Sequence, residues 1–189
     1  MEIHSKAIEA ARKIKLIIFD VDGVLTDGGI YIGEQGELYK PFYCRDGLGI
    51  TLAHKLGLKT AIITGRKSKQ VAFRAKELHI SEVFQGNSDK REAYDELKKR
   101  TGLRDEEIAY IGDDLIDSPI MLPVGLPMAV ADALPDERMH SLVVSCCPGG
   151  RGAVRELLEF IFKAQGKWED LMASFLIPVK SEENAGLIQ

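Results

Sequence analysis

Short apolar runs of strand length alternate along this chain with longer stretches that have helical spacing. The first run, residues 16–19, is unbroken, contains β-branched residues and is soon followed by Gly23, which is typical of a parallel strand buried on both faces. Together, the apolar runs predict strands over residues 16–20, 60–64, 83–84, 108–112, 128–130 and 142–144.

Amphipathic stretches separate these runs and predict helices over residues 8–14, 47–56, 68–78, 90–100 and 153–163, with residues 168–176 continuing the last helix past a weak point at Gly166. Gly57 and Gly102 stand where C-capping glycines are expected. Asp89, with Glu92 three residues later, predicts a capped start for helix 90–100. Strands that alternate with helices favour βαβ units and a parallel sheet.

Residues 28–43 depart from this alternation, because apolar and polar residues alternate there around the turn sequence Gly-Glu-Gln-Gly at 33–36. This pattern predicts a β-hairpin. The chain leaves no room for a second domain between the strands, so we expect no cap domain. The predicted fold is an α/β Rossmann-like three-layer sandwich with a central parallel sheet and a small hairpin flap. It forms one domain over residues 1–176, and we predict a mobile C-terminal tail over residues 177–189.

Composition narrows the functional class. The chain has 189 residues, of which 45% are hydrophobic, enough for one domain with a sizeable core. A net charge of −4 without a basic stripe argues against a nucleic-acid partner, and no apolar run approaches the roughly 18 residues of a membrane span. The polar start is unlike a signal peptide, and Cys44, Cys146 and Cys147 make no disulfide framework, so we expect a cytoplasmic protein.

Two carboxylates, Asp20 and Asp22, follow the first buried strand one residue apart. Open α/β sheets bind their ligands at the carboxyl ends of the strands. Carboxylates so close together repel each other, and a divalent cation relieves this repulsion. The pair therefore predicts a hard-metal site in which one aspartate stays free to act on a substrate.

Further polar groups stand at the other strand and helix ends, in Thr64-Gly65-Arg66, at Lys90 and in Gly112-Asp113-Asp114, with Asp117 nearby. A hydroxyl, an ammonium group and helix N-termini suit phosphate oxygens. Asp113 with one of the first two aspartates suits Mg²⁺. A free carboxylate can then form an aspartyl phosphate while a second one transfers protons. Asp117 serves either as a helix N-cap or as a partner behind the metal ligands.

The motifs Asp-Val-Asp-Gly-Val-Leu-Thr at 20–26, Ile-Thr-Gly-Arg at 63–66, Lys90 and Gly-Asp-Asp at 112–114 occur in this order. In this order they resemble the haloacid dehalogenase-like phosphatases, and the resemblance covers about residues 16–155. Additional segments are similar to the capless group of that family that hydrolyses 3-deoxy-D-manno-octulosonate 8-phosphate in lipopolysaccharide precursor synthesis. These segments are residues 45–50, 85–86, 149–156 and 164–167.

This resemblance implies a role for each motif residue. Asp20 would be the nucleophile and Asp22 the acid/base, while Thr64 and Lys90 would bind the phosphate. Asp20, the main-chain carbonyl of Asp22 and Asp113 would hold Mg²⁺. The implied substrate contacts are Asp22, Tyr43, Cys44, Arg45, Asp46, Gly47, Gly65, Arg66, Arg74 and Lys90. The resemblance also implies a homotetramer in which a neighbour's hairpin and tail cover each site.

Other functions remain open at this point. Thr51 stands where an arginine is expected in well-known members, which keeps open a nonulosonate 9-phosphate phosphatase of sialic-acid-type synthesis. A signalling receiver domain also uses aspartate, threonine, lysine and Mg²⁺, but here the paired aspartates end the first core strand and the chain is longer than such a module. A catalytically silent structural subunit is a third alternative, against which the intact motif set argues.

Overall fold

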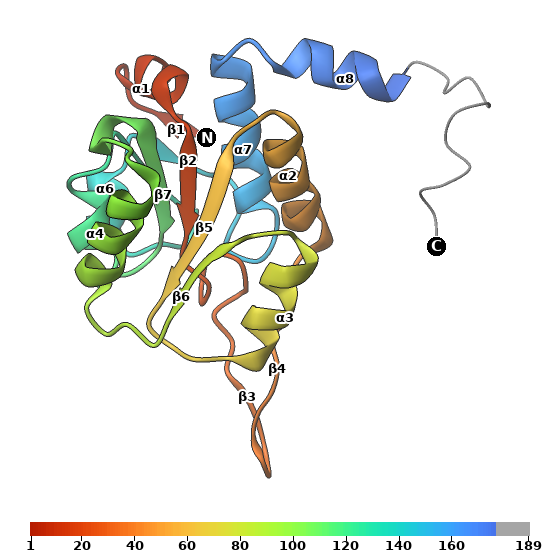
Figure 1. The fold of residues 1–189 in the computed structure, drawn as a ribbon, viewed down its shortest axis with the longest axis vertical. Coiled ribbons are helices and arrows are strands. Elements are labelled where there is room, and N and C mark those ends of the chain that lie inside the picture. Colours follow the sequence, from red (N-terminus) through yellow and green to blue (C-terminus); the bar gives the residue numbers. More distant parts are fainter. Residues whose placement is uncertain (177–189) are drawn as a thin grey trace.

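A seven-stranded sheet forms the centre of the structure, a computed structural model that describes residues 1–176 (Figure 1). The predicted tail, residues 177–189, lies outside the described residues. Neighbouring strands are parallel except for β1, which runs antiparallel to β9 at one edge. The strand order is β1 (Glu2–Ile3), β9 (Val143–Val144), β8 (Leu126–Ala129), β7 (Ile108–Gly112), β2 (Leu16–Phe19), β5 (Lys59–Thr64) and β6 (Glu82–Gln85).

Helices cover both faces of this sheet (Figure 1). One face packs against α1 (Ala7–Lys13), α2 (Cys44–Lys55), α3 (Lys69–Glu77) and α7 (Ala153–Ala164). The opposite face packs against α4 (Lys90–Thr101) and α5 (Ser118–Met121). The remaining elements are η1 (Asp105–Glu107), α6 (Pro135–His140) and α8 (Trp168–Leu176). The predicted three-layer α/β architecture is confirmed.

Strand β2 shows why the apolar run at residues 16–19 is unbroken. Ile17 and Phe19 belong to the core under α1, α2, α3 and α7, whereas Leu16 and Ile18 belong to the core under α4 and α5. Successive side chains of a strand point to opposite faces, so a strand covered on both faces needs apolar residues throughout. Each such side chain contributes about 1.5–3 kcal/mol when it is buried, which holds the strand in register.

The register of the central strands determines where the polar motifs lie. Phe19 pairs with Ile62 of β5 on one side and with Ile111 of β7 on the other. Asp20 follows β2, Thr64 ends β5 and Asp113 follows β7. Because these strands are adjacent and parallel, their carboxyl ends meet at one edge of the sheet.

The predicted hairpin forms a separate two-stranded sheet of β3 (Tyr31–Gly33) and β4 (Gly36–Tyr39). It projects beyond the carboxyl ends of the main strands (Figure 1). The rings of Tyr31 and Tyr39 stack with their centroids 4.4 Å apart. Ile32 is 74% exposed and Leu38 63% exposed, so the hairpin presents apolar side chains to its surroundings. No cap domain is evident within residues 1–176.

Some boundaries differ from the sequence-based prediction. Helix α2 begins at Cys44 and not at residue 47, and residues 168–176 form a separate helix because Gly166 adopts a left-handed conformation with φ +68°. Asp89 caps α4 as predicted, but its carboxylate contacts Arg91 and not Glu92. Sequence patterns missed the two-residue β1, whose hydrogen bonds to β9 come from the far end of the chain, and the short helices α5 and α6.

None of the helices within residues 1–176 is long and apolar enough to cross a lipid bilayer.

Candidate active site

The ammonium group of Lys90 is the centre of a buried charge cluster at the strand ends. Its Nζ lies 2.9 Å from Asp20 Oδ1, 2.6 Å from Asp117 Oδ1 and 3.2 Å from the Tyr110 hydroxyl. Burial by itself lowers the pKa of Lys90, but the carboxylates of Asp20 and Asp117 outweigh it and raise this pKa above its ordinary value. Lys90 therefore carries a full positive charge directly beside Asp20.

Asp117 has no exposed surface and uses both of its oxygens. Oδ1 accepts hydrogen bonds from Lys90 and from the Tyr110 hydroxyl, the latter at 2.6 Å. Oδ2 accepts the backbone N–H groups of Asp113 at 2.9 Å and Asp114 at 3.2 Å. Its side chain makes no N-capping hydrogen bond to α5. Of the two roles that the sequence left open, the structure therefore shows the supporting one: Asp117 holds Lys90 and the loop that carries Asp113.

The carboxylates of Asp20, Asp113 and Asp117 each offer an oxygen within 4.8 Å of the others. Within residues 1–176, Asp113 Oδ1 is buried without a hydrogen-bond partner, and Asp20 Oδ1 is buried with the Lys90 ammonium as its ion-pair partner. Burial, with the neighbouring negative charges, raises the pKa of Asp20 to about 6 and that of Asp113 to about 8. Crowded carboxylates with open acceptor atoms fit a hard divalent cation such as Mg²⁺. Since the oxygens of Asp117 are occupied, Asp20 and Asp113 are the available side-chain ligands.

Gly23, in the loop after Asp22, allows Asp113 to reach this position. Its φ of +90° is a conformation that other residues rarely adopt, and a Cβ at this position would overlap the carboxylate of Asp113. The Gly that follows the paired aspartates is therefore part of the site, because it makes room for a carboxylate from β7.

Asp22 faces the hairpin. Its carboxylate forms an ion pair with Lys40 and lies 3.7 Å from the Nε of Arg66. Thr64 is buried at the end of β5, and Gly65 and Arg66 follow it. The main-chain carbonyl of Thr64 accepts the N–H of Gly86 at 3.1 Å, which holds this strand end against the loop after β6.

Lys40 and Glu37 of the hairpin are neighbours of the site that sequence reasoning missed. The side chain of Lys40 is only 2% exposed and contacts both Asp22 and Glu37, the latter at 3.1 Å. Glu37 also lies 3.8 Å from Arg66 and accepts a hydrogen bond from the Ser68 hydroxyl. A lysine in a hairpin is normally solvated, so nothing in the local pattern distinguishes Lys40.

Apart from Asp22, Gly65, Arg66 and Lys90, the predicted substrate-binding residues fall into two groups. Cys44 and Arg74 line a cavity of about 620 Å³ between the hairpin and α3, near Tyr39, Lys40 and Phe73. Gly47 lies beneath it, where a Cβ would overlap the guanidinium of Arg74. Arg74 donates to Glu77 at 2.6 Å, while its Nε is buried without a hydrogen-bond partner.

The second group does not line that cavity, although Tyr43 and Asp46 line a smaller hollow with Arg74. Asp46 is buried, and its carboxylate accepts the N–H groups of Gly152 at 3.2 Å and Arg155 at 2.8 Å. It therefore links α2 to the start of α7. Arg45 is exposed, and Tyr43 is half-buried next to Gly152. The predicted contacts of all these residues with a substrate stay predictions.

Comparison with known proteins adds to this geometry. The family model of haloacid dehalogenase-like hydrolases matches residues 69–141. The chain is 46% identical over 168 residues to the 3-deoxy-D-manno-octulosonate 8-phosphate phosphatase KdsC of Escherichia coli K12, an alignment that covers 89% of each protein.

Two solved structures are also similar. The crystal structure of 3-deoxy-D-manno-octulosonate 8-phosphate phosphatase from Yersinia pestis is 48% identical with a TM-score of 0.85, over 87% of this chain and 89% of that one. The Moraxella catarrhalis phosphatase of the same name, in complex with a magnesium ion, a phosphate ion and a KDO molecule, is 42% identical with a TM-score of 0.87. That alignment covers 91% of this chain and 99% of the Moraxella chain.

Proposed function

The chain belongs to the haloacid dehalogenase-like hydrolases, in the branch of the 3-deoxy-D-manno-octulosonate 8-phosphate phosphatases, and we propose that it is a Mg²⁺-dependent phosphatase of that specificity. It hydrolyses 3-deoxy-D-manno-octulosonate 8-phosphate to the free sugar acid and phosphate in lipopolysaccharide biosynthesis. The observation that carries this proposal is the clustering of Asp20, Lys90 and Asp113. Asp20 follows β2, Asp113 follows β7 and Lys90 begins α4. The nine-carbon alternative is not favoured, since the similar proteins are named for the eight-carbon substrate.

The proposed reaction follows from the residues at the strand ends. The Asp20 carboxylate attacks phosphorus and forms an aspartyl phosphate, while Asp22 gives a proton to the departing sugar oxygen. Asp22 then takes a proton from the water that hydrolyses the aspartyl phosphate. Lys90 and Thr64 hold the phosphate oxygens throughout. Asp20, Asp113 and the Asp22 carbonyl would hold Mg²⁺, which would supply positive charge against the phosphate dianion.

Lys90 has a second role in this mechanism. Burial raises the pKa of Asp20, and the positive charge of Lys90 opposes this rise, which leaves the pKa at about 6 and the nucleophile mostly ionised at neutral pH. The ammonium of Lys90 lies 2.9 Å from the Asp20 carboxylate. Asp117 and Tyr110 fix that ammonium between them and so keep it directed at Asp20.

The remaining proposals concern the whole protein. Residues 1–176 form one hydrolase domain, and the protein is a homotetramer that acts in the cytoplasm on a phosphorylated sugar acid. The exposed apolar side chains of the hairpin support the assembly, because they are available to a neighbouring subunit. The three free cysteines are consistent with a reducing compartment.

A substrate screen tests the proposed function. Phosphate release is measured from 3-deoxy-D-manno-octulosonate 8-phosphate, from a nonulosonate 9-phosphate and from a generic phosphate ester, each with Mg²⁺ and with EDTA. We expect the eight-carbon substrate to have the highest kcat/KM, and activity to disappear with EDTA or in Asp20→Asn. Equal turnover of the two sugar acids, or full activity of Asp20→Asn, contradicts the proposal.

A further inference from the structure

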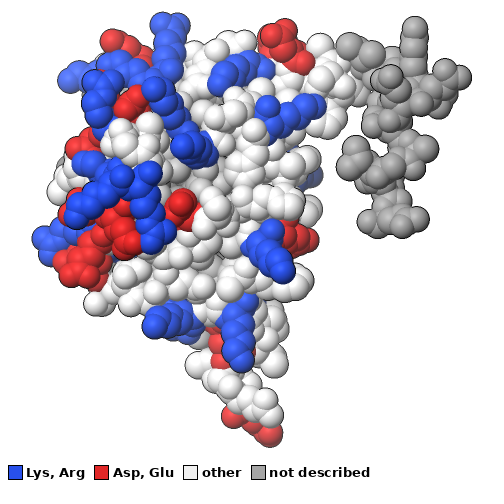
Figure 2. All heavy atoms as spheres, viewed as in Figure 1, with Lys and Arg blue, Asp and Glu red and all other residues white. Residues whose placement is uncertain are grey.

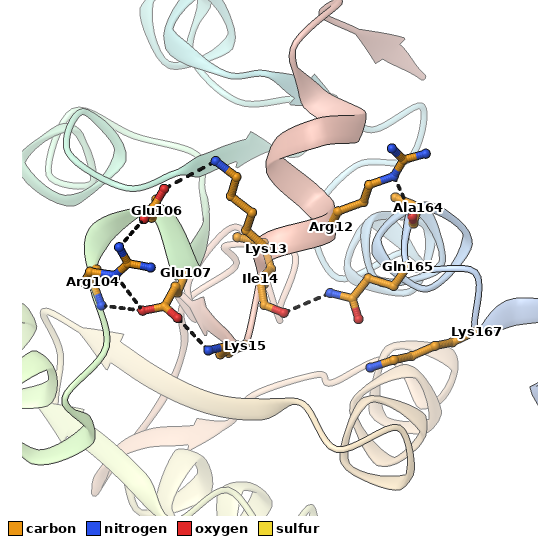
Figure 3. A pocket seen from close by; sticks show the side chains of 10 residues that line it. All are labelled: Arg12, Lys13, Ile14, Lys15, Arg104, Glu106, Glu107, Ala164, Gln165 and Lys167. Atoms are coloured by element: carbon orange, nitrogen blue, oxygen red, sulfur yellow. Dashed lines mark hydrogen bonds and ion pairs between the residues drawn. The ribbon is translucent and has the colours of Figure 1, made fainter.

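A second hollow lies at the end of the sheet opposite the proposed active site. Lys15 immediately precedes β2 and Glu107 immediately precedes β7, whereas Asp20 and Asp113 follow the same two strands. A strand of this length separates the two ends by roughly 15 Å. The hollow is a cavity of about 640 Å³ between the end of α1, η1 and the connection from α7 to α8 (Figure 3).

Positive charge exceeds negative charge in this cavity. Five basic side chains line it, and only two carboxylates do. Glu106 pairs with Lys13 at 3.3 Å and with Arg104 at 2.7 Å. Glu107 pairs with Lys15 at 2.6 Å and lies 3.4 Å from the Nε of Arg104. Both carboxylates are therefore fully engaged by three of the five cations.

The other two cations, Arg12 and Lys167, have no carboxylate partner within residues 1–176. The Nε of Arg12 donates to the carbonyl of Ala164 at 3.4 Å, and the Nζ of Lys167 donates to the carbonyl of Leu56 at 3.1 Å. Figure 2 shows lysine and arginine side chains gathered at this end of the molecule, although the chain as a whole has a net charge of −4.

Helix ends account for only part of this excess. The C-termini of α1 and α7 lie at this cavity, and the C-terminus of α2 contacts Lys167 through the carbonyl of Leu56. Each helix end carries about half a negative charge. Against an excess of three positive side chains, these ends leave roughly one and a half positive charges unbalanced. These cations therefore interact favourably with the helix C-termini, but the helix ends do not neutralise all of their charge.

Gln165 indicates what else a ligand must offer. Its amide nitrogen donates to the carbonyls of Ala11 at 3.0 Å and Ile14 at 2.9 Å, which fixes the side chain. Its carbonyl oxygen is turned away from Ile14 into the hollow (Figure 3). This acceptor can receive a hydrogen bond from a ligand hydroxyl group. Residues 164–167, which sequence analysis singled out and the catalytic site does not use, supply this amide and Lys167.

We propose that this cavity binds a small phosphorylated metabolite that carries hydroxyl groups. Its phosphate lies against Arg12 and Lys167, and a hydroxyl donates to Gln165. Ammonium and guanidinium groups are the natural partners of phosphate oxygens. A volume of about 640 Å³ exceeds what inorganic phosphate needs and falls in the usual range of small-molecule sites. This proposal does not depend on the proposed catalytic function.

Isothermal titration calorimetry tests this proposal. Glucose 6-phosphate is titrated into the protein in the presence of EDTA, and inorganic phosphate is titrated in a parallel experiment. The variant Arg12→Gln/Lys167→Gln should bind glucose 6-phosphate at least about tenfold more weakly than the wild type. The matched variant Lys6→Gln/Lys99→Gln removes the same charge at exposed positions elsewhere and should bind within about twofold of it. Equal binding by all three proteins, or equal weakening by both variants, overturns the proposal. Tighter binding of inorganic phosphate than of glucose 6-phosphate overturns the hydroxyl part.

A third variant guards against a folding defect. Glu106→Gln removes a carboxylate from the cavity and leaves Lys13 and Arg104 with less negative charge nearby, so it should tighten the binding of glucose 6-phosphate several-fold. If the cations are purely structural, this variant should not change binding. Crystals of the full chain soaked in tungstate, a heavy phosphate analogue, locate the site. Density between Arg12 and Lys167 supports the proposal, and density at the catalytic strand ends alone overturns it.

Discussion

A single buried lysine links catalysis and stability at the scale of residues. Lys90 is held by Asp117 and Tyr110, and it contacts the proposed nucleophile Asp20. Removing one partner of a buried ion pair leaves the other charge uncompensated and costs about 3–5 kcal/mol. Asp117 therefore matters to the fold and to the reaction, although it touches no substrate in the proposed mechanism.

The variant Asp117→Asn tests this coupling. We expect its free energy of unfolding to fall by about 3 kcal/mol and its phosphatase activity to drop, because Lys90 loses one of its two carboxylate partners. Asp114→Asn is the matched control, since Asp114 is exposed and its side chain accepts, among residues 1–176, only the N–H of Leu115. It should stay within about 0.5 kcal/mol of the wild type. Urea unfolding gives the comparison, and equal effects of the two variants would contradict this role.

The carboxylates of Asp20 and Asp113 also predict a pH-dependent effect of Mg²⁺ on stability. The pKa values of Asp20, about 6, and Asp113, about 8, lie above the ordinary value of 3.8 in the metal-free protein. Between pH 4 and pH 8 the native state then holds protons that the unfolded chain has released, so the metal-free protein loses stability as the pH rises. Mg²⁺ binds the ionised carboxylates and displaces these protons.

We therefore expect Mg²⁺ to raise the thermal unfolding midpoint more at pH 8 than at pH 6. Differential scanning calorimetry at both pH values, with Mg²⁺ and with EDTA, measures the difference. Asp113→Asn removes the carboxylate with the higher pKa. In this variant, Mg²⁺ should change the thermal unfolding midpoint only slightly at either pH. If Mg²⁺ raised the unfolding midpoint of the wild type more at pH 6 than at pH 8, the prediction would be contradicted.

At the scale of elements, the hairpin is tied to the catalytic loop by charge. Lys40, which directly follows β4, contacts Asp22. Glu37 of β4 contacts both Lys40 and Ser68, in the segment after β5. The position of the proposed acid/base is thus coupled to an element that otherwise projects away from the sheet (Figure 1). Misplacing a reacting group by about 1 Å can cost a hundredfold in rate.

The variant Lys40→Met tests this connection. We expect kcat to fall about ten- to hundredfold, with a smaller change in KM, because Asp22 loses the contact that orients it. Lys40→Arg should recover part of the loss by restoring a cation. Lys76→Met, at an exposed lysine of α3, is the control and should keep its activity. Unchanged kcat in Lys40→Met would show that the hairpin does not position Asp22.

At the scale of the whole molecule, the two ends of the sheet differ in character. The carboxyl end carries the buried acidic cluster and the apolar hairpin, and the opposite end carries the basic cavity. An exposed apolar hairpin next to an open site favours burial against another subunit. The proposed tetramer follows from this end of the molecule and not from the basic one.

The variant Ile32→Glu should therefore weaken the assembly, since it places a charge on an apolar side chain that is 74% exposed at the hairpin. Ile8→Glu, on α1 at the opposite end of the sheet, is the matched control. Sedimentation velocity at micromolar concentration should show a tetramer for the wild type and the control, and smaller species for Ile32→Glu. A wild type that is only monomeric contradicts the proposal.

The sequence by itself determined the sheet and the residues at its catalytic end. Unbroken apolar runs identify buried parallel strands, and parallel strands bring their carboxyl ends to one edge, so Asp20, Thr64 and Asp113 could be grouped without coordinates. Only the tertiary structure decided the roles of Lys40, Asp117 and the basic cavity. The contacts that define these roles include Lys40 with Asp22, 18 residues apart, and Asp117 with Lys90, 27 residues apart. The charge of a side chain has no defined effect until folding sets its distance from other charges and from water.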